Sequence, residues 1–305
     1  MRIWYQSFTV IDKLRDYRET LQNHLCAVAR PDVEVVVHGM PAEAYGEYAP
    51  TEFVSRVALA SYYARDFMAN ARRAEAEGYD AFAIGHLPDL ALRECRSLVD
   101  IPVVGLGEAA MRTACYLGDR FSIICFINDA IPLYQRNIDD YGLRSKAGPI
   151  LAMELSFEEL MGSFKSPETI ASRFLRLAEK AIDANADVLI PGEGVLAECL
   201  RLAGVNRVGD VPVLDVQAAL VKACESLADL RRISGVYVNR RGFFFARPRR
   251  ELMEHAARFH GHQVSQSGST NDGASDCPGL PHQPHFRVDH HRQVCPMPTT
   301  GETLC

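Results

Sequence analysis

Apolar residues along this chain form short runs that alternate with longer amphipathic segments. Runs such as VEVVVH (Val33 to His38), DAFAIG and FSIICF are short and uniformly apolar, which predicts strands buried on both faces. The segments 50–78, 108–117 and 166–184 are longer and carry apolar residues at helical intervals. Short buried strands that alternate with helices predict an α/β fold with doubly wound parallel sheets. In such folds, functional side chains are expected at the carboxyl ends of the strands.

The same pattern predicts several further elements. Strands are expected at Arg2 to Tyr5 and in the runs IPVVGLG, ILAMEL, DVLIPG and VPVLD, and helices at 130–142 and 216–230. After about residue 261 the pattern stops. Residues 263–305 are dense in Gly, Pro, Ser and Thr and poor in large apolar side chains, so we expect a disordered tail. The His and Cys residues of this tail match no standard zinc spacing, so no metal is predicted.

The chain repeats one of its own segments. GYDAFAIGH, a helix and VDIPVVGLGEAA are followed later by NADVLIPGE, a helix and VGDVPVLDVQAA. In each copy a strand ends in glycine, Gly85 in the first and Gly192 in the second. The next residue is His86 in the first copy and Glu193 in the second. Two similar half-units would meet across a cleft, so we expect each to present one strand-end residue to it.

The repeat also indicates how the chain divides into lobes. We expect residues 1–105 plus 215–260 to form a first α/β lobe, and residues 106–214 to form a second. The two lobes would be pseudosymmetric, with a cleft between them.

Composition and charge narrow the function classes. The chain has 305 residues, 48% of them hydrophobic, and a formal net charge of −6. A negative balance argues against nucleic acid or an anionic membrane as a partner, because both need a basic face. No apolar run reaches the roughly 18 residues of a membrane span, and MRIWYQSFTV has no signal-peptide pattern. Scattered cysteines in apolar segments suit buried thiols, so a cytoplasmic location is expected.

The repeated segments resemble a known family. GYDAFAIGHLPDLALRECRSLVDIPVVGLGEAAM, followed by LGDRFSII, resembles the hydantoin racemase branch of the aspartate/glutamate racemase superfamily. ADVLIPGEG and VPVLDVQAAL are similar to the second active-site strand and closing helix of that family. The resemblance covers about residues 1–230. It implies two α/β lobes around a small-molecule substrate, no cofactor, and a possible homo-oligomer.

The chain departs from this family where the chemistry is expected. Family members typically carry a cysteine at each of the two strand ends, where one thiolate removes a proton α to a carboxylate or ring carbonyl and the opposite thiol returns one. Here His86 and Glu193 occupy these positions. Gln6-Ser7-Phe8 replaces an Asn-Pro-Asn-like turn, and Cys125-Phe126 replaces a Thr pair. The substrate contacts predicted on this basis are Gln6, Ser7, Gly85, Glu108, Cys125, Phe126, Gly192 and Gly194.

His86 and Glu193 suggest proton transfer with a preferred direction. Their ordinary pKa values, about 6.5 and 4.3, are mismatched, so one protonation arrangement should dominate. Three functions remain open. The first is a racemase- or isomerase-like enzyme acting by acid/base chemistry on a small carboxylate, hydantoin or cyclic amide. The second is a hydrolase or decarboxylase that uses the same pair. The third is a non-catalytic small-molecule-binding or regulatory protein that lost its catalysis with its cysteines. Taken singly, Glu193 could instead interact with the amides of the following helix and His86 could be structural.

Overall fold

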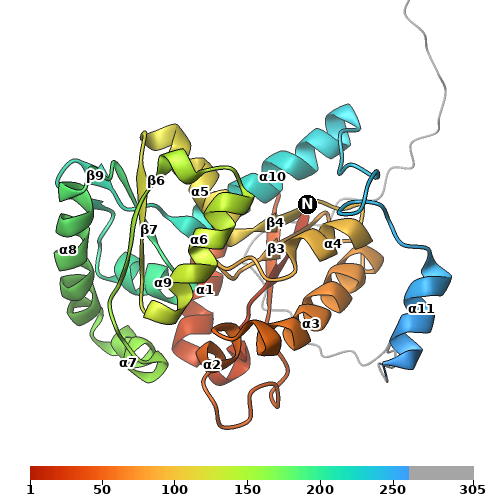
Figure 1. Cartoon of the computed structure of the whole chain (residues 1–305), viewed down its shortest axis with the longest axis horizontal. Coiled ribbons are helices and arrows are strands. Elements are labelled where there is room, and N and C mark those ends of the chain that lie inside the picture. Colours follow the sequence, from red (N-terminus) through yellow and green to blue (C-terminus); the bar gives the residue numbers. More distant parts are fainter. Residues whose placement is uncertain (261–305) are drawn as a thin grey trace, which may run out of the picture. The chain divides into compact units, whose positions relative to one another are not determined.

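The computed structural model describes residues 1–260, and the predicted tail at 263–305 lies outside the described residues. The strands are β1 (Arg2–Gln6), β2 (Glu34–His38), β3 (Ala81–Ile84), β4 (Val103–Gly105), β5 (Phe121–Cys125), β6 (Ala147–Ala152), β7 (Val188–Pro191), β8 (Arg207–Val208) and β9 (Val211–Pro212). One sheet has the order β2-β1-β3-β4 and another β6-β5-β7. Figure 1 shows β3 and β4 of the first sheet and β6 and β7 of the second. All pairings within these two sheets are parallel. The predicted α/β class with parallel sheets is therefore confirmed.

Helices precede, connect and follow these strands. They are α1 (Arg15–Val28), α2 (Pro50–Val54), α3 (Val57–Ala76), α4 (Leu92–Leu98), α5 (Leu106–Leu117), α6 (Ile131–Asp140), α7 (Phe157–Gly162), α8 (Pro167–Asp183), α9 (Gly194–Leu202), α10 (Val216–Ser234) and α11 (Arg250–Phe259). The helix expected over 50–78 is interrupted at Ser55 and Arg56, where Arg56 adopts an extended backbone. Helices α1, α7 and α11 were not predicted.

Alternate residues of the four-stranded sheet face two different cores. Ile3 and Tyr5 of β1 lie in a core that also contains side chains of α1, α5 and α10. Trp4, between them, lies in a second core with side chains of α3 and α4. The first of these cores continues without a break to Ile123 and Val188 of the other sheet. Both faces of the first sheet are thus covered, as a doubly wound fold requires.

The two sheets repeat the same strand arrangement. β5 lies between β6 and β7, as β1 lies between β2 and β3. The fourth place of the second sheet is taken only by a parallel bridge between Leu189 and Val213. In the predicted strand VPVLD, Val211–Pro212 form β9, which pairs antiparallel with β8 and not with the second sheet. At the start of each repeat an Asp side chain accepts a hydrogen bond from a backbone N–H at or just before the start of a neighbouring strand. Asp80 accepts from Arg2 N at 2.7 Å, and Asp187 accepts from Arg120 N at 3.0 Å. We call the region around the first sheet the first lobe and that around the second sheet the second lobe.

A buried histidine joins α1 to two later helices. His24 Nδ1 lies 2.6 Å from Glu198 Oε1 on α9, and His24 Nε2 lies 2.9 Å from Asp215 Oδ2 at the start of α10. Burial alone would lower the pKa of His24, but the hydrogen bonds to Asp215 and Glu198 outweigh it and raise that pKa to about 9. The imidazole is therefore positively charged at neutral pH. It is a charged crosslink between helices of both lobes.

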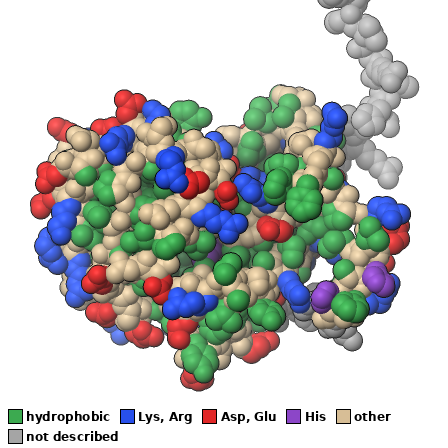
Figure 2. All heavy atoms as spheres, in the orientation of Figure 1, with side chains coloured by type: hydrophobic (Ala, Val, Ile, Leu, Met, Phe, Trp, Pro, Cys, Tyr) green, Lys and Arg blue, Asp and Glu red, His purple; other side chains and the backbone are tan. Residues whose placement is uncertain are grey.

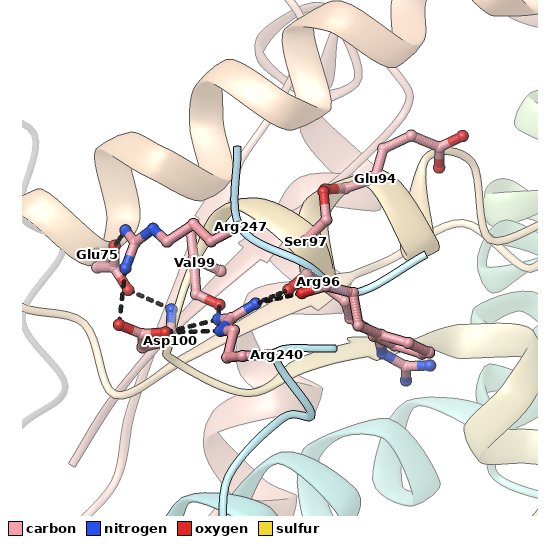
Figure 3. A network of polar contacts seen from close by, with 9 residues as sticks. Glu75, Glu94, Arg96, Ser97, Val99, Asp100, Arg240 and Arg247 are labelled. Atoms are coloured by element: carbon pink, nitrogen blue, oxygen red, sulfur yellow. Dashed lines mark hydrogen bonds and ion pairs between the residues drawn. The ribbon is translucent and has the colours of Figure 1, made fainter. Parts of the chain in front are cut away.

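The segment after α10 is held to the first lobe by ion pairs. Asp100 lies between two arginines (Figure 3), with Arg240 Nη2 at 2.6 Å from its Oδ1 and Arg247 Nη1 at 2.7 Å from its Oδ2. Arg247 also pairs with Glu75 of α3 at 2.7 Å, and Arg240 donates to the carbonyl of Arg96 at 2.8 Å. These contacts fix residues 240–247 against the loop before β4.

Other properties of the surface and chain bear on function. Within residues 1–260, every helix is too short or too polar to span a bilayer. In the same residues, no group of three His, Cys, Asp or Glu side chains is arranged to hold a metal ion. Basic and acidic side chains are intermixed on the face shown in Figure 2.

The residue limits predicted for the two lobes, 1–105 plus 215–260 and 106–214, stay a prediction.

Candidate active site

The two strand ends of the repeat are shaped by close packing at their glycines. A Cβ on Gly85 would lie 2.2 Å from the Tyr5 ring, and one on Gly192 would lie 2.6 Å from Cys125 Cβ. The backbone amides of these glycines extend the sheets, since Gly85 N donates to Gln6 O and Gly192 N donates to Ile124 O. Only glycine fits at either position, so the backbone can pack this closely against the neighbouring strand just before His86 and Glu193.

The residues that follow, His86 and Glu193, line one cavity between the lobes. Its volume is about 70 Å³. The lining consists of Ser7, Phe8, Thr9, Tyr17, Pro50, Thr51, Val54, Ser55, Gly85, His86, Leu87, Pro88, Phe126, Ile127, Ala130, Leu133, Tyr134, Phe157, Leu160, Glu193, Gly194 and Val195. Most of this surface is apolar, and no Lys or Arg belongs to it in the part of the chain that the structure describes. His86 and Glu193 are therefore the ionisable pair of a largely apolar chamber.

His86 is held by stacking rather than by a hydrogen bond. Its ring lies parallel to Phe8, with 4.6 Å between centroids and 21° between planes. Its Nδ1 is buried and has no hydrogen-bond partner within residues 1–260. Because no carboxylate supports the positive form, burial lowers the pKa of His86 to about 3. The imidazole is neutral at physiological pH.

Glu193 is held by hydrogen bonds. The hydroxyl of Tyr134 lies 2.8 Å from Glu193 Oε1, and the backbone N–H of Phe126 donates to Oε2 at 3.3 Å. Burial raises the pKa of Glu193 to about 8, although both hydrogen bonds act to lower it. The side chain is therefore mostly protonated at neutral pH. Glu193 precedes α9 but makes no side-chain hydrogen bond to its amides, so the helix-capping alternative is wrong.

The apolar cavity reverses the order of the two pKa values. From ordinary values, imidazole should bind a proton more tightly than the carboxylate. In the structure, burial lowers the pKa of His86 to about 3 and raises that of Glu193 to about 8. A dominant arrangement therefore exists, with a neutral His86 and a protonated Glu193. It is opposite to the one that the ordinary values give.

Comparison with known proteins places the chain in a family. The family model described as Asp/Glu/Hydantoin racemase matches residues 16–224, more than half of the chain. The chain belongs to the Asp/Glu/hydantoin racemase family. A hydantoin racemase of Rhizobium meliloti is 29% identical over 160 residues, 52% of this chain and 65% of that relative. A hydantoin racemase of Pseudomonas sp. (strain NS671) is 27% identical over 160 residues, 52% of this chain and 62% of that relative. These matches span less than two thirds of the relatives' own length.

Solved structures agree with the fold of this family. An allantoin racemase from Klebsiella pneumoniae superposes with a TM-score of 0.66 at 22% identity, covering 82% of this chain and 94% of that one. The allantoin racemase of Pseudomonas fluorescens gives a TM-score of 0.65 at 24% identity, covering 82% of this chain and 97% of that one. At this level of identity the likeness establishes a shared racemase-family fold.

Side chains of helix α6 form hydrogen bonds with the segments that follow both strand ends. From α6, Tyr134 donates toward the second-lobe strand end, and Asn137 Nδ2 donates to Pro88 O at 2.9 Å, two residues after His86. Tyr141, which follows α6, donates to Asp89 Oδ2 at 2.5 Å. Tyr134 was not among the predicted site residues. Its signal was a spacing of three and four residues between Tyr134, Asn137 and Tyr141, which places three polar groups on one helix face.

The predicted substrate contacts fall into two groups. Ser7, Gly85, Phe126 and Gly194 line the cavity with His86 and Glu193, and Gln6, Glu108, Cys125 and Gly192 are not part of the lining. Gln6 instead accepts from Trp4 Nε1 and Asn70 Nδ2. The cover of the cavity includes α2, which the sequence did not indicate as part of the site.

Three of the predicted contacts outside the lining have structural partners. Glu108 pairs with Arg96 at 2.6 Å and with Arg112 at 2.9 Å. The thiol of Cys125 donates to Ile127 O, and burial raises its pKa far above the ordinary range. The carbonyl of Gly192 accepts from Tyr134 at 2.7 Å. The contacts of these three residues are with other groups of the protein, and none of the three residues lines the cavity.

Proposed function

We propose that this protein is a racemase- or isomerase-like enzyme that moves a proton between His86, Glu193 and a small substrate. The observation that carries the proposal is that both residues follow equivalent strand-end glycines and line one cavity. Membership of the Asp/Glu/hydantoin racemase family supports proton transfer as the reaction type. In this assignment the protonated Glu193 is the acid. The neutral His86 is the hydrogen-bonding partner or a weak base, because burial disfavours its imidazolium form.

The cavity favours an uncharged substrate over a small carboxylate. A bound carboxylate needs a cation or several donors to replace its hydration, and the lining has no Lys or Arg among residues 1–260. A hydantoin or another cyclic amide enters an apolar chamber at lower cost. Ser7 and Thr9 in the lining have hydroxyls that are hydrogen-bonded to each other at 2.9 Å, which leaves one hydroxyl hydrogen of the pair for the polar edge of the cyclic amide. Relatives named hydantoin racemase agree with this class. We therefore assign a cyclic amide with an acidic C–H as the substrate class.

The fixed protonation arrangement also favours a second candidate, a one-directional reaction. A racemase works equally in both directions when its two proton carriers have matched pKa values. Here burial moves the pKa of Glu193 up and that of His86 down. Such a site suits a step in which Glu193 protonates a carbanion, as in decarboxylation. The apolar lining that makes a bound carboxylate costly would in that case favour its departure as uncharged CO2.

Proton NMR in D2O tests these alternatives. The protein would be incubated with a panel of hydantoins including allantoin, amino acids, malonates and maleate, beside His86→Ala and Glu193→Gln variants. Deuterium entering an α position, and lost in both variants, is the expected result for the proton-transfer enzyme. Product with no exchange of remaining substrate supports the one-directional reaction.

Matched controls separate chemistry from general damage. His255→Ala and Glu168→Gln make the same chemical changes at exposed residues outside the lining and should keep wild-type exchange. If no probe reacts, and ligand-induced stabilisation is equal in the wild type and both site variants, the acid/base assignment is refuted. A binding protein would then be the better description.

A further inference from the structure

The hydroxyl of Tyr134 has one hydrogen but lies close to two oxygen atoms that could accept it. It lies 2.7 Å from Gly192 O and 2.8 Å from Glu193 Oε1, both within hydrogen-bond distance. A phenol can donate one hydrogen bond and accept others, whereas a carbonyl oxygen can only accept. Both contacts are full two-centre hydrogen bonds at once only if Tyr134 donates to Gly192 O and Glu193 donates to Tyr134; otherwise the two acceptors share one hydrogen. The geometry therefore matches a protonated Glu193.

The loss of that proton changes what Tyr134 must do. In the proposed reaction, the O–H bond of Glu193 breaks, the proton forms a C–H bond with the carbanionic carbon of the substrate, and the electron pair stays on Oε1. The carboxylate so formed faces an apolar cavity with no Lys or Arg in its lining within residues 1–260. The N–H of Phe126 remains on Oε2 at 3.3 Å, which leaves Oε1 without a donor. Rotation of one hydroxyl hydrogen on Tyr134 supplies that donor.

We propose that Tyr134 is a positioning residue whose hydroxyl switches from Gly192 O to Glu193 Oε1 when Glu193 gives up its proton. The proposal rests on the proposed function for its role in catalysis. The switch itself depends only on the protonation of Glu193. In the resting site Tyr134 accepts the acidic hydrogen of Glu193, which turns from Tyr134 to the substrate carbon for the transfer. After the transfer Tyr134 stabilises the carboxylate. No heavy atom has to move, so a closely packed residue can make the change.

The surroundings of Tyr134 leave it few other partners. Its side chain is 1% exposed, and its two hydroxyl contacts are those to Gly192 and Glu193. Tyr141 provides a natural comparison on the same helix face, because its hydroxyl contacts Asp89 and not Glu193. A purely structural role for Tyr134 would resemble that of Tyr141. The two tyrosines can therefore be tested against each other.

Infrared difference spectroscopy over a pH series tests the switch without any substrate. The protonated-carboxyl band that disappears in Glu193→Gln belongs to Glu193, and in the wild type it should titrate with a midpoint near pH 8. The phenolic C–O band of Tyr134, assigned by its loss in Tyr134→Phe, should shift at the same midpoint. In Tyr134→Phe the carboxyl midpoint should rise by about one pH unit, because the ionised form loses a charge-assisted hydrogen bond. Tyr141→Phe should leave the midpoint unchanged.

Kinetics on a reacting hydantoin provide a second readout. Tyr134→Phe should lower kcat by roughly 10- to 100-fold with little change in KM, because the lost contact forms fully only during proton transfer. A carboxyl midpoint unchanged by Tyr134→Phe, or a wild-type phenolic band that does not follow the titration, overturns the proposal. The wild-type series applies even if the variant fails to fold. Failure of every probe to exchange counts against the proposed function alone, since the infrared series does not use turnover.

Discussion

Replacing Glu193 by Gln should make the protein more stable, and increasingly so as the pH rises. The pKa of Glu193 is raised from 4.5 in an unfolded chain to about 8 in the folded one. The folded state therefore holds a proton that the unfolded state releases, and stability falls as pH rises between these two values. The glutamine of the Glu193→Gln variant would not titrate and would keep both hydrogen bonds, since its amide can donate to Tyr134 and accept from the Phe126 N–H.

The expected gain in folding stability follows from the size of the pKa shift of Glu193. Each pKa unit corresponds to about 1.4 kcal/mol, so at pH 7, about 2.5 units above the unfolded-chain pKa, the difference is roughly 3 kcal/mol. Partial exposure of the side chain reduces this, and we expect Glu193→Gln to gain about 2 kcal/mol at pH 7 and about 3 kcal/mol at pH 8.5. At pH 4.5 the gain should be close to zero. Functional groups in active sites commonly lower the folding stability of the protein.

Urea unfolding of both proteins at several pH values measures this difference. The single Trp, Trp4, is buried in the first lobe and reports on unfolding, and a reducing agent keeps the thiols reduced. Glu168→Gln is the matched control, because the same chemical change on an exposed side chain should alter stability little at any pH. A difference between Glu193→Gln and wild type that stays constant from pH 4.5 to 8.5 would refute the claim that Glu193 is protonated in the folded state.

Three further outcomes follow from other parts of the structure. The raised pKa of His24, about 9, means that its stabilisation is complete below pH 6.5 and is lost as pH rises through 9. His24→Gln should therefore cost about 2–3 kcal/mol at pH 6 and little at pH 10, measured by urea unfolding. Gly85→Ala should destabilise by about 2–4 kcal/mol, measured in the same way, because the added Cβ would meet the Tyr5 ring at 2.2 Å. Arg240→Ala should speed proteolysis of residues 235–260, because it removes the pairing with Asp100, whereas the exposed Arg241 should tolerate the same change.

The sequence was sufficient to predict the fold class and to single out two strand-end residues that lie at one cavity, whereas their catalytic role stays a prediction. Buried strands and the repeated Asp-strand-Gly unit predicted two equivalent strand ends, and His86 and Glu193 indeed line one cavity. Helix α1 was missed, although Tyr17, Leu21 and Leu25 recur every four residues, because its intervening residues are strongly polar. Tyr134 was missed for a different reason. Its role depends on the packing of α6 across both lobes, and no local pattern gives that packing.

The same local limit explains why the order of the two pKa values could not be predicted. Residue type supplies ordinary values, whereas the shifts here come from desolvation by side chains distant in the sequence. Phe8 stacks on the His86 ring without offering an acceptor, which penalises the imidazolium. Tyr134 and Phe126 do offer donors to Glu193, but burial outweighs them. One apolar chamber thus keeps both groups neutral. The pair for which the residue types predict only that one protonation arrangement dominates is, in the folded protein, a neutral ring and a protonated carboxyl.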